Sequence, residues 1–327
     1  MNPFEYQRPL DIPTTLQAFS SGARFLAGGT NLIDLMKNGV EKPLKLIDIN
    51  RVALAEIRPL PGGGVRLGAL ARNADTANHP LVREQYPLLS RAILAGASPQ
   101  IRNVATNGGN LLQRTRCPYF MYTEFPACNK RVPGSGCAAI GGSNRMHAIL
   151  GASEACVAVH PSDMCVALAA LDATVLVRGI DGERSIPFSD FHRLPEQSPQ
   201  LDTNLKEGEL IVAIDLPRSP YTAHSHYLKV RDRASYDFAL VSVAAALEIE
   251  GGRIRSARIA LGGVAHKPWR AESAERALAG QPATTSVMEA AAAEAVREAR
   301  PLSQNAFKIP LARNAIVRAL SIAGELA

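Results

Sequence analysis

The stretch Leu26-Ala27-Gly28-Gly29-Thr30-Asn31-Leu32-Ile33-Asp34 is the strongest indication of how this chain folds. It follows a short apolar segment, residues 23–26, and runs into an amphipathic one. Two adjacent glycines let the backbone take positive φ and approach a ligand closely, because no Cβ intervenes. Successive N–H groups in such a turn can converge on an anion, and a following helix start adds partial positive charge. The stretch therefore predicts a cradle for a diphosphate.

A second glycine turn, Thr106-Asn107-Gly108-Gly109-Asn110, lies far downstream. Two such turns suit a long ligand with a central diphosphate, such as a dinucleotide. The first turn is not a Rossmann fingerprint, since G-x-G-x-x-G is absent there, and no Gly-Lys-Ser/Thr follows it as in a P-loop. A dinucleotide site would therefore belong to another fold, and an ordinary strand-to-helix turn is the alternative.

Length and charge limit the function classes. The 327 residues are enough for two domains. The net charge is +6 and the isoelectric point about 9.2, but the basic residues are scattered. The sequence lacks the Lys/Arg-rich run of a nucleic-acid footprint, so we expect no nucleic acid and a mildly basic surface that suits an acidic protein partner.

The N-terminus and the apolar runs of the chain bear on its expected location. Residues 1–6 have neither a basic nor an apolar region of the kind that makes a signal peptide. Apolar runs fall short of the roughly 20 residues that a membrane span needs. We therefore expect synthesis in the cytoplasm, no membrane span, and export only alongside a partner that carries a signal.

All five cysteines lie between positions 117 and 165, and an odd number argues against a disulfide framework. Cys117, Cys128, Cys137 and Cys156 occupy a Pro-, Gly-, Asn- and Ser-rich segment that is predicted to be irregular. A long irregular loop in a compact domain needs something to hold it, and four thiolates on zinc or an iron–sulfur cluster would do so. The spacing C-x10-C-x8-C-x18-C matches neither the zinc-ribbon nor the ferredoxin pattern, so unrelated thiols remain the alternative. Cys165 lies in an apolar helical pattern and is predicted to be a core residue.

The periodicity predicts an α/β first half and an α+β second half, with Pro217-Arg218-Ser219-Pro220 as the boundary. Strands are predicted at 23–26, 44–49, 64–68, 174–177, 209–214, 226–231, 240–250 and 254–261. Helices are predicted at 14–19, 86–94, 162–171, 271–279, 285–298 and 311–322.

Four motifs occur in order along the chain: Ala27-Gly28-Gly29-Thr30-Asn31-Leu32, Thr106-Asn107-Gly108-Gly109-Asn110-Leu111, Pro161-Ser162-Asp163, and Leu261-Gly262-Gly263-Val264-Ala265. Together they resemble the FAD-binding subunit of xanthine dehydrogenase-type molybdenum hydroxylases, essentially from end to end. The resemblance implies an α+β fold. It implies a two-part FAD-binding domain of the vanillyl-alcohol-oxidase/PCMH type at 1–218, and a C-terminal flavoprotein domain at 222–327 with a three-stranded antiparallel sheet and a helix bundle.

About forty residues are inserted between the second glycine turn and the Ser162-Asp163 helix start. This Cys-rich insertion, at 112–160, resembles the [4Fe–4S] loop of the flavin subunits of 4-hydroxybenzoyl-CoA reductase and of periplasmic aldehyde oxidoreductase, the second being the nearer. The resemblance implies that Cys117, Cys128, Cys137 and Cys156 hold the cluster.

The resemblance also implies a set of FAD-binding residues. They are Leu26, Ala27, Gly28, Gly29, Thr30, Asn31, Leu32, Ile33 and Asp34 in the first turn, and Thr106, Gly109 and Asn110 in the second. Asp163 matches a carboxylate near the sugar region, and Lys229 a lysine near the isoalloxazine ring. Without the resemblance, Lys229 would be interpreted as a solvated lysine of an edge strand. His160 and Tyr236 could also reach the site.

The implied function is electron transfer, since the chain offers neither a nucleophile with its base nor a carboxylate pair for hydrolysis. A large molybdenum-cofactor subunit and a small [2Fe–2S] subunit would complete a heterotrimer, and FAD would pass electrons to an external acceptor. The periplasm is the expected location, by co-export, and the cytoplasm otherwise. The alternatives are a self-sufficient flavin oxidase or reductase, a non-catalytic zinc-binding assembly subunit, and a 4-hydroxybenzoyl-CoA reductase-type flavin subunit.

Overall fold

The computed structural model describes residues 1–325. Its helices are α1 (Ile12–Gln17), α2 (Leu32–Lys37), α3 (Asn73–Asn78), α4 (Pro80–Gln85), α5 (Pro87–Ala95), α6 (Pro99–Arg102), α7 (Asn107–Leu111), α8 (Pro118–Met121), α9 (Ala138–Gly141), α10 (Asp163–Ala170), α11 (Phe188–Phe191), α12 (Glu272–Leu278), α13 (Thr285–Ala295) and α14 (Lys308–Ala323). Its strands are β1 (Glu5–Gln7), β2 (Ala23–Leu26), β3 (Lys45–Asp48), β4 (Ile57–Pro59), β5 (Val65–Gly68), β6 (Thr174–Gly179), β7 (Gly182–Pro187), β8 (Leu210–Leu216), β9 (Ser225–Val230), β10 (Val241–Glu250), β11 (Arg253–Gly262) and β12 (Trp269–Arg270).

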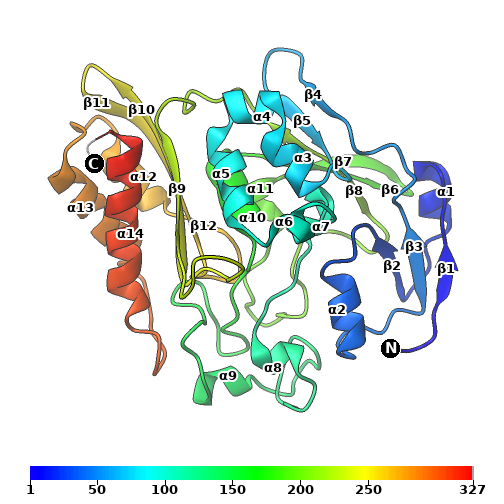
Figure 1. Cartoon of the computed structure of the whole chain (residues 1–327). Coiled ribbons are helices and arrows are strands. Elements are labelled where there is room, and N and C mark those ends of the chain that lie inside the picture. The colour runs from blue at the N-terminus through cyan, green and yellow to red at the C-terminus, as the bar shows by residue number, and fades with distance from the viewer. Residues whose placement is uncertain (326–327) are drawn as a thin grey trace.

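Three sheets are arranged along the molecule. The small sheet of β1 to β3 and the C-terminal sheet lie at opposite ends, with helices α3 to α7 and α10 between them (Figure 1). The segment that carries α8 and α9 lies apart from these layers, at the bottom of the same view. The mixed α+β architecture that the resemblance implies is thereby observed.

The N-terminal sheet is parallel, in the order β1-β3-β2. Strand β2 ends at Leu26, which pairs with Asp48 at the end of β3. The first glycine turn therefore leaves the sheet at the carboxyl ends of parallel strands, which is where ligands bind in open α/β sheets.

The second sheet is antiparallel, in the order β4-β5-β8-β6-β7. Helix α10 belongs to the same core as Val175 and Ile214 of this sheet, and all eight of its residues are buried. A helix that is apolar on every side belongs in a core. Cys165, on this helix, is 0% exposed and is the core residue that the sequence predicts.

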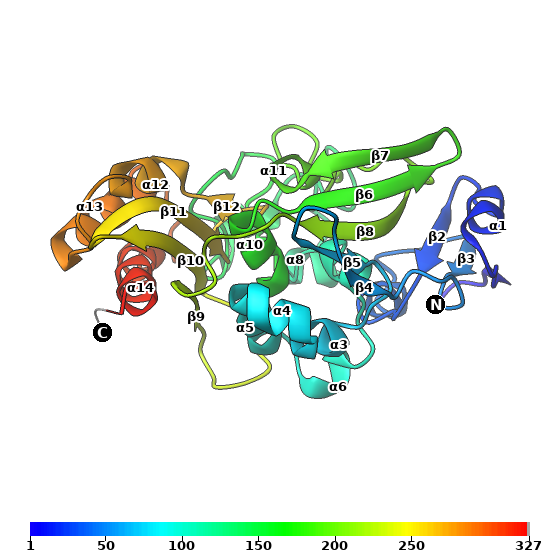
Figure 2. The same ribbon diagram turned by 90° about the horizontal axis from the view of Figure 1, so that it is seen from above.

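The C-terminal sheet contains the three predicted antiparallel strands, and the two-residue strand β12 extends it in the order β12-β11-β10-β9. Both faces of β10 are buried. Val243, Ala245 and Leu247 belong to one core with α12 and α14, whereas Ala244 and Ala246 belong to another with α5 and α10. Figure 2 shows α14 and α10 on opposite sides of β10. This double burial explains why residues 243–247 are continuously apolar instead of alternating.

Two C-terminal helix boundaries differ from the prediction. Helix α13 ends at Ala295, three residues before the predicted end, and α14 begins at Lys308, three residues before the predicted start. Pro310 suggests a later start, but proline is tolerated in the first turn because its missing N–H has no partner there. Within residues 1–325, no helix combines the length and apolarity that a membrane crossing needs.

Candidate functional site

One cavity of about 600 Å³ brings the predicted FAD-binding residues together. Both glycine turns, the start of α10 and strand β9 contribute to its wall, although they are far apart in sequence. The volume lies within the range of cofactor pockets. The predicted residues that line it are Leu26, Ala27, Gly28, Gly29, Thr30, Asn31, Leu32, Asp34, Thr106, Gly109, Asn110, Asp163 and Lys229.

The first turn requires its glycines for two different reasons. A Cβ on Gly28 would lie 2.1 Å from the Val104 carbonyl oxygen, so only glycine lets these two backbone segments meet. Gly29 has φ +71°, a conformation that side chains disfavour. Among the described residues, none accepts a hydrogen bond from the backbone N–H groups of residues 28–31. These donors therefore remain available to an anion at the cavity wall.

The second turn uses its donors internally. The N–H groups of Asn107 and Gly108 donate to the carbonyls of Ala71 and Ala69, and that of Gly109 to the hydroxyl of Thr106, the N-cap of α7. The two turns look alike in sequence, but the N–H groups of Asn107, Gly108 and Gly109 are bonded, whereas those of residues 28–31 are free. The second turn fixes the position of the cavity wall.

Ile33 is the one predicted FAD-binding residue that does not line the cavity. Its side chain packs beneath the turn, 2.9 Å from where a Cβ of Gly29 would lie, and its N–H donates to the Gly29 carbonyl. Helix α2 begins at Leu32, and the Ile33 side chain points to a different side of this helix from Leu32 and Asp34, which line the cavity.

Asp163 and Lys229 form a buried ion pair at the cavity wall. Lys229 Nζ lies 2.8 Å from Asp163 Oδ2, and the two side chains are 4% and 7% exposed. Nζ also donates to the Ala95 carbonyl, and the Tyr227 hydroxyl donates to Asp163 Oδ1 at 2.7 Å. Burial, and then the Asp163 charge, raises the pKa of Tyr227 well above its usual value. Lys229 is therefore a fixed buried cation and not a solvated edge-strand lysine.

Tyr227 was missed in the sequence, although it stands two residues before Lys229 on β9 and therefore shares its face. Several cations of the cavity wall were missed as well. With Lys229, the cavity is lined by Arg24, Arg102, Arg114, Arg116 and Arg233. Arg114 and Arg116 stand just after the second glycine turn in the sequence, and this position could have indicated that cations line the cavity. Such cations suit a diphosphate.

A second cavity of about 190 Å³ continues from the first toward the Cys-rich loop. It shares Asp163 and Phe238 with the first cavity and reaches Cys117 and His147. His160 lines this second cavity, whereas Tyr236 lines the first. The two predicted cofactor sites are thus neighbours.

The four loop cysteines converge. Cys117, Cys128, Cys137 and Cys156 all line one small cavity of about 10 Å³. Burial raises the pKa of Cys117 to about 11, whereas a hydrogen bond from Cys156 lowers that of Cys137 below its usual value. The convergent thiols fit the donor set of an iron–sulfur cluster and also that of zinc.

Protein contacts also hold the loop. The Arg131 guanidinium donates to the carbonyls of Tyr119, Phe120, Tyr122 and Phe125. The buried side chain of Asn144 bonds to Ala139, Ile140, Gly142 and Ser303. We expected that a long irregular loop needs something to hold it, and these two side chains do so in part.

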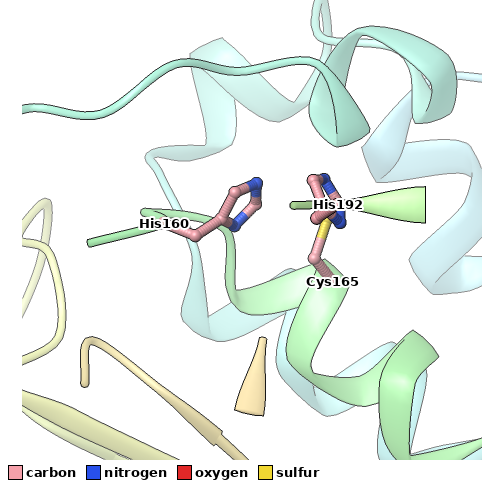
Figure 3. A group of neighbouring side chains, drawn as sticks. All are labelled: His160, Cys165 and His192. Atoms are coloured by element: carbon pink, nitrogen blue, oxygen red, sulfur yellow. The ribbon is translucent and has the colours of Figure 1, made fainter. Parts of the chain in front are cut away.

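His160, Cys165 and His192 form a group whose ligand atoms lie within 4.8 Å of one another, with Cys165 and His192 buried (Figure 3). The hydrogen bond that His160 accepts opposes metal binding. His160 Nδ1 accepts from the Ser162 N–H, so its Nε2 carries the proton, and His192 Nε2 faces the Leu111 carbonyl at 2.8 Å. A metal ligand at His160 Nε2 would need the opposite tautomer. The group is therefore a neutral packing cluster beneath the cavity.

Two family models match the chain. One, described as the FAD binding domain in molybdopterin dehydrogenase, matches residues 2–219. The other, described as the CO dehydrogenase flavoprotein C-terminal domain, matches residues 226–323. The similarity therefore extends over both predicted cofactor sites and the C-terminal sheet.

Individual proteins show the same similarity. The chain is 51% identical over 326 residues to the aldehyde oxidoreductase FAD-binding subunit PaoB of Escherichia coli (strain K12), with 98% of each covered. Carbon monoxide dehydrogenase from Hydrogenophaga pseudoflava matches at 28% identity with a TM-score of 0.77, over 98% of this chain and 97% of that one. Quinoline 2-oxidoreductase from Pseudomonas putida 86 matches at 26% identity with a TM-score of 0.77, over 100% and 98%.

Proposed function

The chain belongs to the FAD-binding subunits of the molybdopterin dehydrogenase family, and we propose that it is the electron-transfer subunit of a molybdenum-dependent aldehyde oxidoreductase. It is an oxidoreductase-family flavoprotein. The observation that carries the proposal is the shared cavity, where the free N–H groups of residues 28–31 face the same space as the buried pair of Asp163 and Lys229. The aldehyde assignment is supported by the 51% identity to an aldehyde oxidoreductase subunit.

The side chains and backbone of the cavity bind and orient the cofactor. The N–H groups of residues 28–31 would hold the diphosphate, assisted by cations such as Arg114 and Arg116. Lys229 would place a fixed positive charge near the flavin ring, and Asp163 holds Lys229 in position. FAD, when bound, supplies the two-electron redox chemistry.

We further propose that Cys117, Cys128, Cys137 and Cys156 bind a [4Fe–4S] cluster. Their convergence on one cavity supports this. The second cavity lies between these cysteines and Asp163, so a relay role is sterically open to the cluster, and a structural role is the alternative.

The proposal includes partners. A large molybdenum-cofactor subunit would oxidise the substrate, and a small [2Fe–2S] subunit would deliver electrons to this chain for an external acceptor. The solved relative from H. pseudoflava is described as lacking the Mo-pyranopterin moiety of its molybdenum cofactor, which supports a molybdenum partner. Mass spectrometry of the native complex tests for a heterotrimer.

We also propose that the subunit works in the periplasm after co-export with a signal-bearing partner. The resemblance of the Cys-rich loop to that of periplasmic aldehyde oxidoreductase supports this location. Cell fractionation tests it: the chain should reach the periplasm when its partners are expressed and stay in the cytoplasm when the partner's signal is deleted.

The first experiment is the visible spectrum of the anaerobically purified full chain, before and after dithionite. Flavin bands on a broad iron–sulfur absorbance, both bleached on reduction, are the expected result. Flavin bands alone, with zinc by elemental analysis, would retain FAD and overturn the cluster. A colourless protein that neither takes up added FAD nor contains iron would overturn both and favour an assembly subunit.

A further inference from the structure

A chain of buried and half-buried charges connects the Cys-rich loop to the FAD cavity. Lys130 Nζ, on a side chain that is 1% exposed, lies 2.5 Å from Asp202 Oδ1 and donates to the Pro199 carbonyl at 2.7 Å. The other oxygen of Asp202 accepts from Arg114 Nε at 2.8 Å. Arg114 Nη1 in turn lies 2.6 Å from Glu41 Oε1. We call these four residues the charge chain.

Each end of the charge chain lies at one of the proposed cofactor sites. Lys130 lines the small cavity that the four cysteines share. Arg114 and Glu41 line the FAD cavity, and the Arg114 N–H donates to Asn31 Oδ1 of the first glycine turn. An ammonium is thus fixed at the cysteines by contacts that originate at the flavin site.

The position of Lys130 is unusual for a lysine. An ammonium is rarely buried unless it is paired, and Asp202 provides the pairing. Burial acts to raise the pKa of Asp202, but the Lys130 and Arg114 charges outweigh it and hold that pKa well below its usual range. Asp202 therefore stays ionised and keeps the ammonium at the wall of the cysteine cavity.

We propose that Lys130 sets the reduction potential of the loop cluster, and that Asp202 is the positioning residue that holds the Lys130 ammonium in place. This inference rests on the proposed function, because it requires the cluster. A [4Fe–4S] cluster on four thiolates is a dianion, and one-electron reduction makes it a trianion without moving a proton. A fixed cation in a medium of low dielectric constant stabilises the trianion more than the dianion. Lys130 therefore raises the reduction potential of the cluster.

The test compares the full-length protein with its Lys130→Met variant. The Lys130→Arg variant is the control, because it keeps the positive charge. Met keeps the length of the side chain, and Asp202 still has Arg114 as a partner. The cluster potential is measured by EPR-monitored redox titration, alongside iron and FAD per chain. We expect a shift to more negative potential in Lys130→Met, little shift in Lys130→Arg, and unchanged FAD content.

The outcomes are distinguishable. An iron-free wild-type chain contradicts the proposed cluster itself. An iron-loaded Lys130→Met chain with the wild-type potential overturns the inference alone. The Lys130→Met variant could lose its iron. In that case, iron retained in Lys130→Arg supports the role of the Lys130 charge. Iron lost from both variants overturns that role and shows that Lys130 acts by packing.

The role of Asp202 is tested by a double-mutant cycle. If Asp202 acts through Lys130, then Lys130→Met should shift the potential much less in an Asp202→Asn background than in the wild type. An equal shift in both backgrounds would overturn the positioning role. A purely structural effect of Asp202 would not produce this coupling.

Discussion

The Lys229 ammonium lies 2.8 Å from the Asp163 carboxylate, with less than a tenth of either side chain exposed. A buried pair of this kind adds little stability over a well-packed apolar pair, because both charges lose their hydration. Removing one partner is different, since the other charge stays buried alone. The pair therefore makes the FAD cavity wall sensitive to either residue.

Lys229→Met should destabilise the chain by about 3–5 kcal/mol, because Asp163 would keep only the Tyr227 hydroxyl as a side-chain partner. Urea unfolding at neutral pH measures this. The matched control is the exposed pair of Arg145 and Asp232, whose side chains are 46% and 51% exposed. Arg145→Met should cost less than about 1 kcal/mol. Similar costs at the two sites would contradict the argument.

Gly28→Ala should weaken FAD binding by at least about tenfold. The new Cβ would lie 2.1 Å from the Val104 carbonyl oxygen, so the turn must move and its N–H groups lose their alignment. Flavin fluorescence titration of the apoprotein measures the affinity. Gly141→Ala is the control, because no atom lies within 4 Å of its added Cβ. Wild-type affinity in Gly28→Ala would rule out this account of the turn.

Cys128→Ser should lose iron, whereas Cys165→Ala should keep it. Cys128 lines the cavity of the four cysteines, and Cys165 is a core residue of α10. Iron per chain, measured on anaerobically purified protein, separates the two. Iron retained in Cys128→Ser would argue against ligation. A cluster that relays electrons predicts slower flavin reduction in this variant of the assembled complex, and a structural cluster predicts a protease-sensitive loop instead.

Stability should fall as pH drops from about 6.5 toward 4. Burial lowers the pKa of His192 and of His266 to about 4, and the Lys130 charge adds to the effect at His266. The unfolded chain takes up these protons below about pH 6.5, whereas the folded chain does so only near pH 4, so the stability is complete above the unfolded pKa. At pH 4, each of the two histidines should lower the free energy of unfolding by roughly 3 kcal/mol relative to neutral pH.

Urea midpoints between pH 7.5 and 4.5 test this dependence. His192→Gln removes one titrating group and can still donate to the Leu111 carbonyl, so its stability should depend less steeply on pH. An identical slope in the variant and the wild type would show that His192 does not contribute.

Local features of the chain were predictable from sequence. Strand β2 and the glycine turn after it lie where the pattern places them, because an apolar segment and two glycines restrict the backbone locally. The apolar run of β10 was predictable as a strand for the same reason. Its burial on both faces was not, because that depends on α10 and α14, which come from distant parts of the chain.

The sequence by itself determined the family, the two glycine turns and the four-cysteine loop, because these depend on residue type and order. The tertiary structure decided what the similar turns do: residues 28–31 keep free N–H groups, whereas those of Asn107 to Gly109 are bonded internally. It also decided that Lys229 meets Asp163 and that Lys130 meets Asp202. Such pairings join residues 66 and 72 positions apart, so they follow from packing and not from any local pattern.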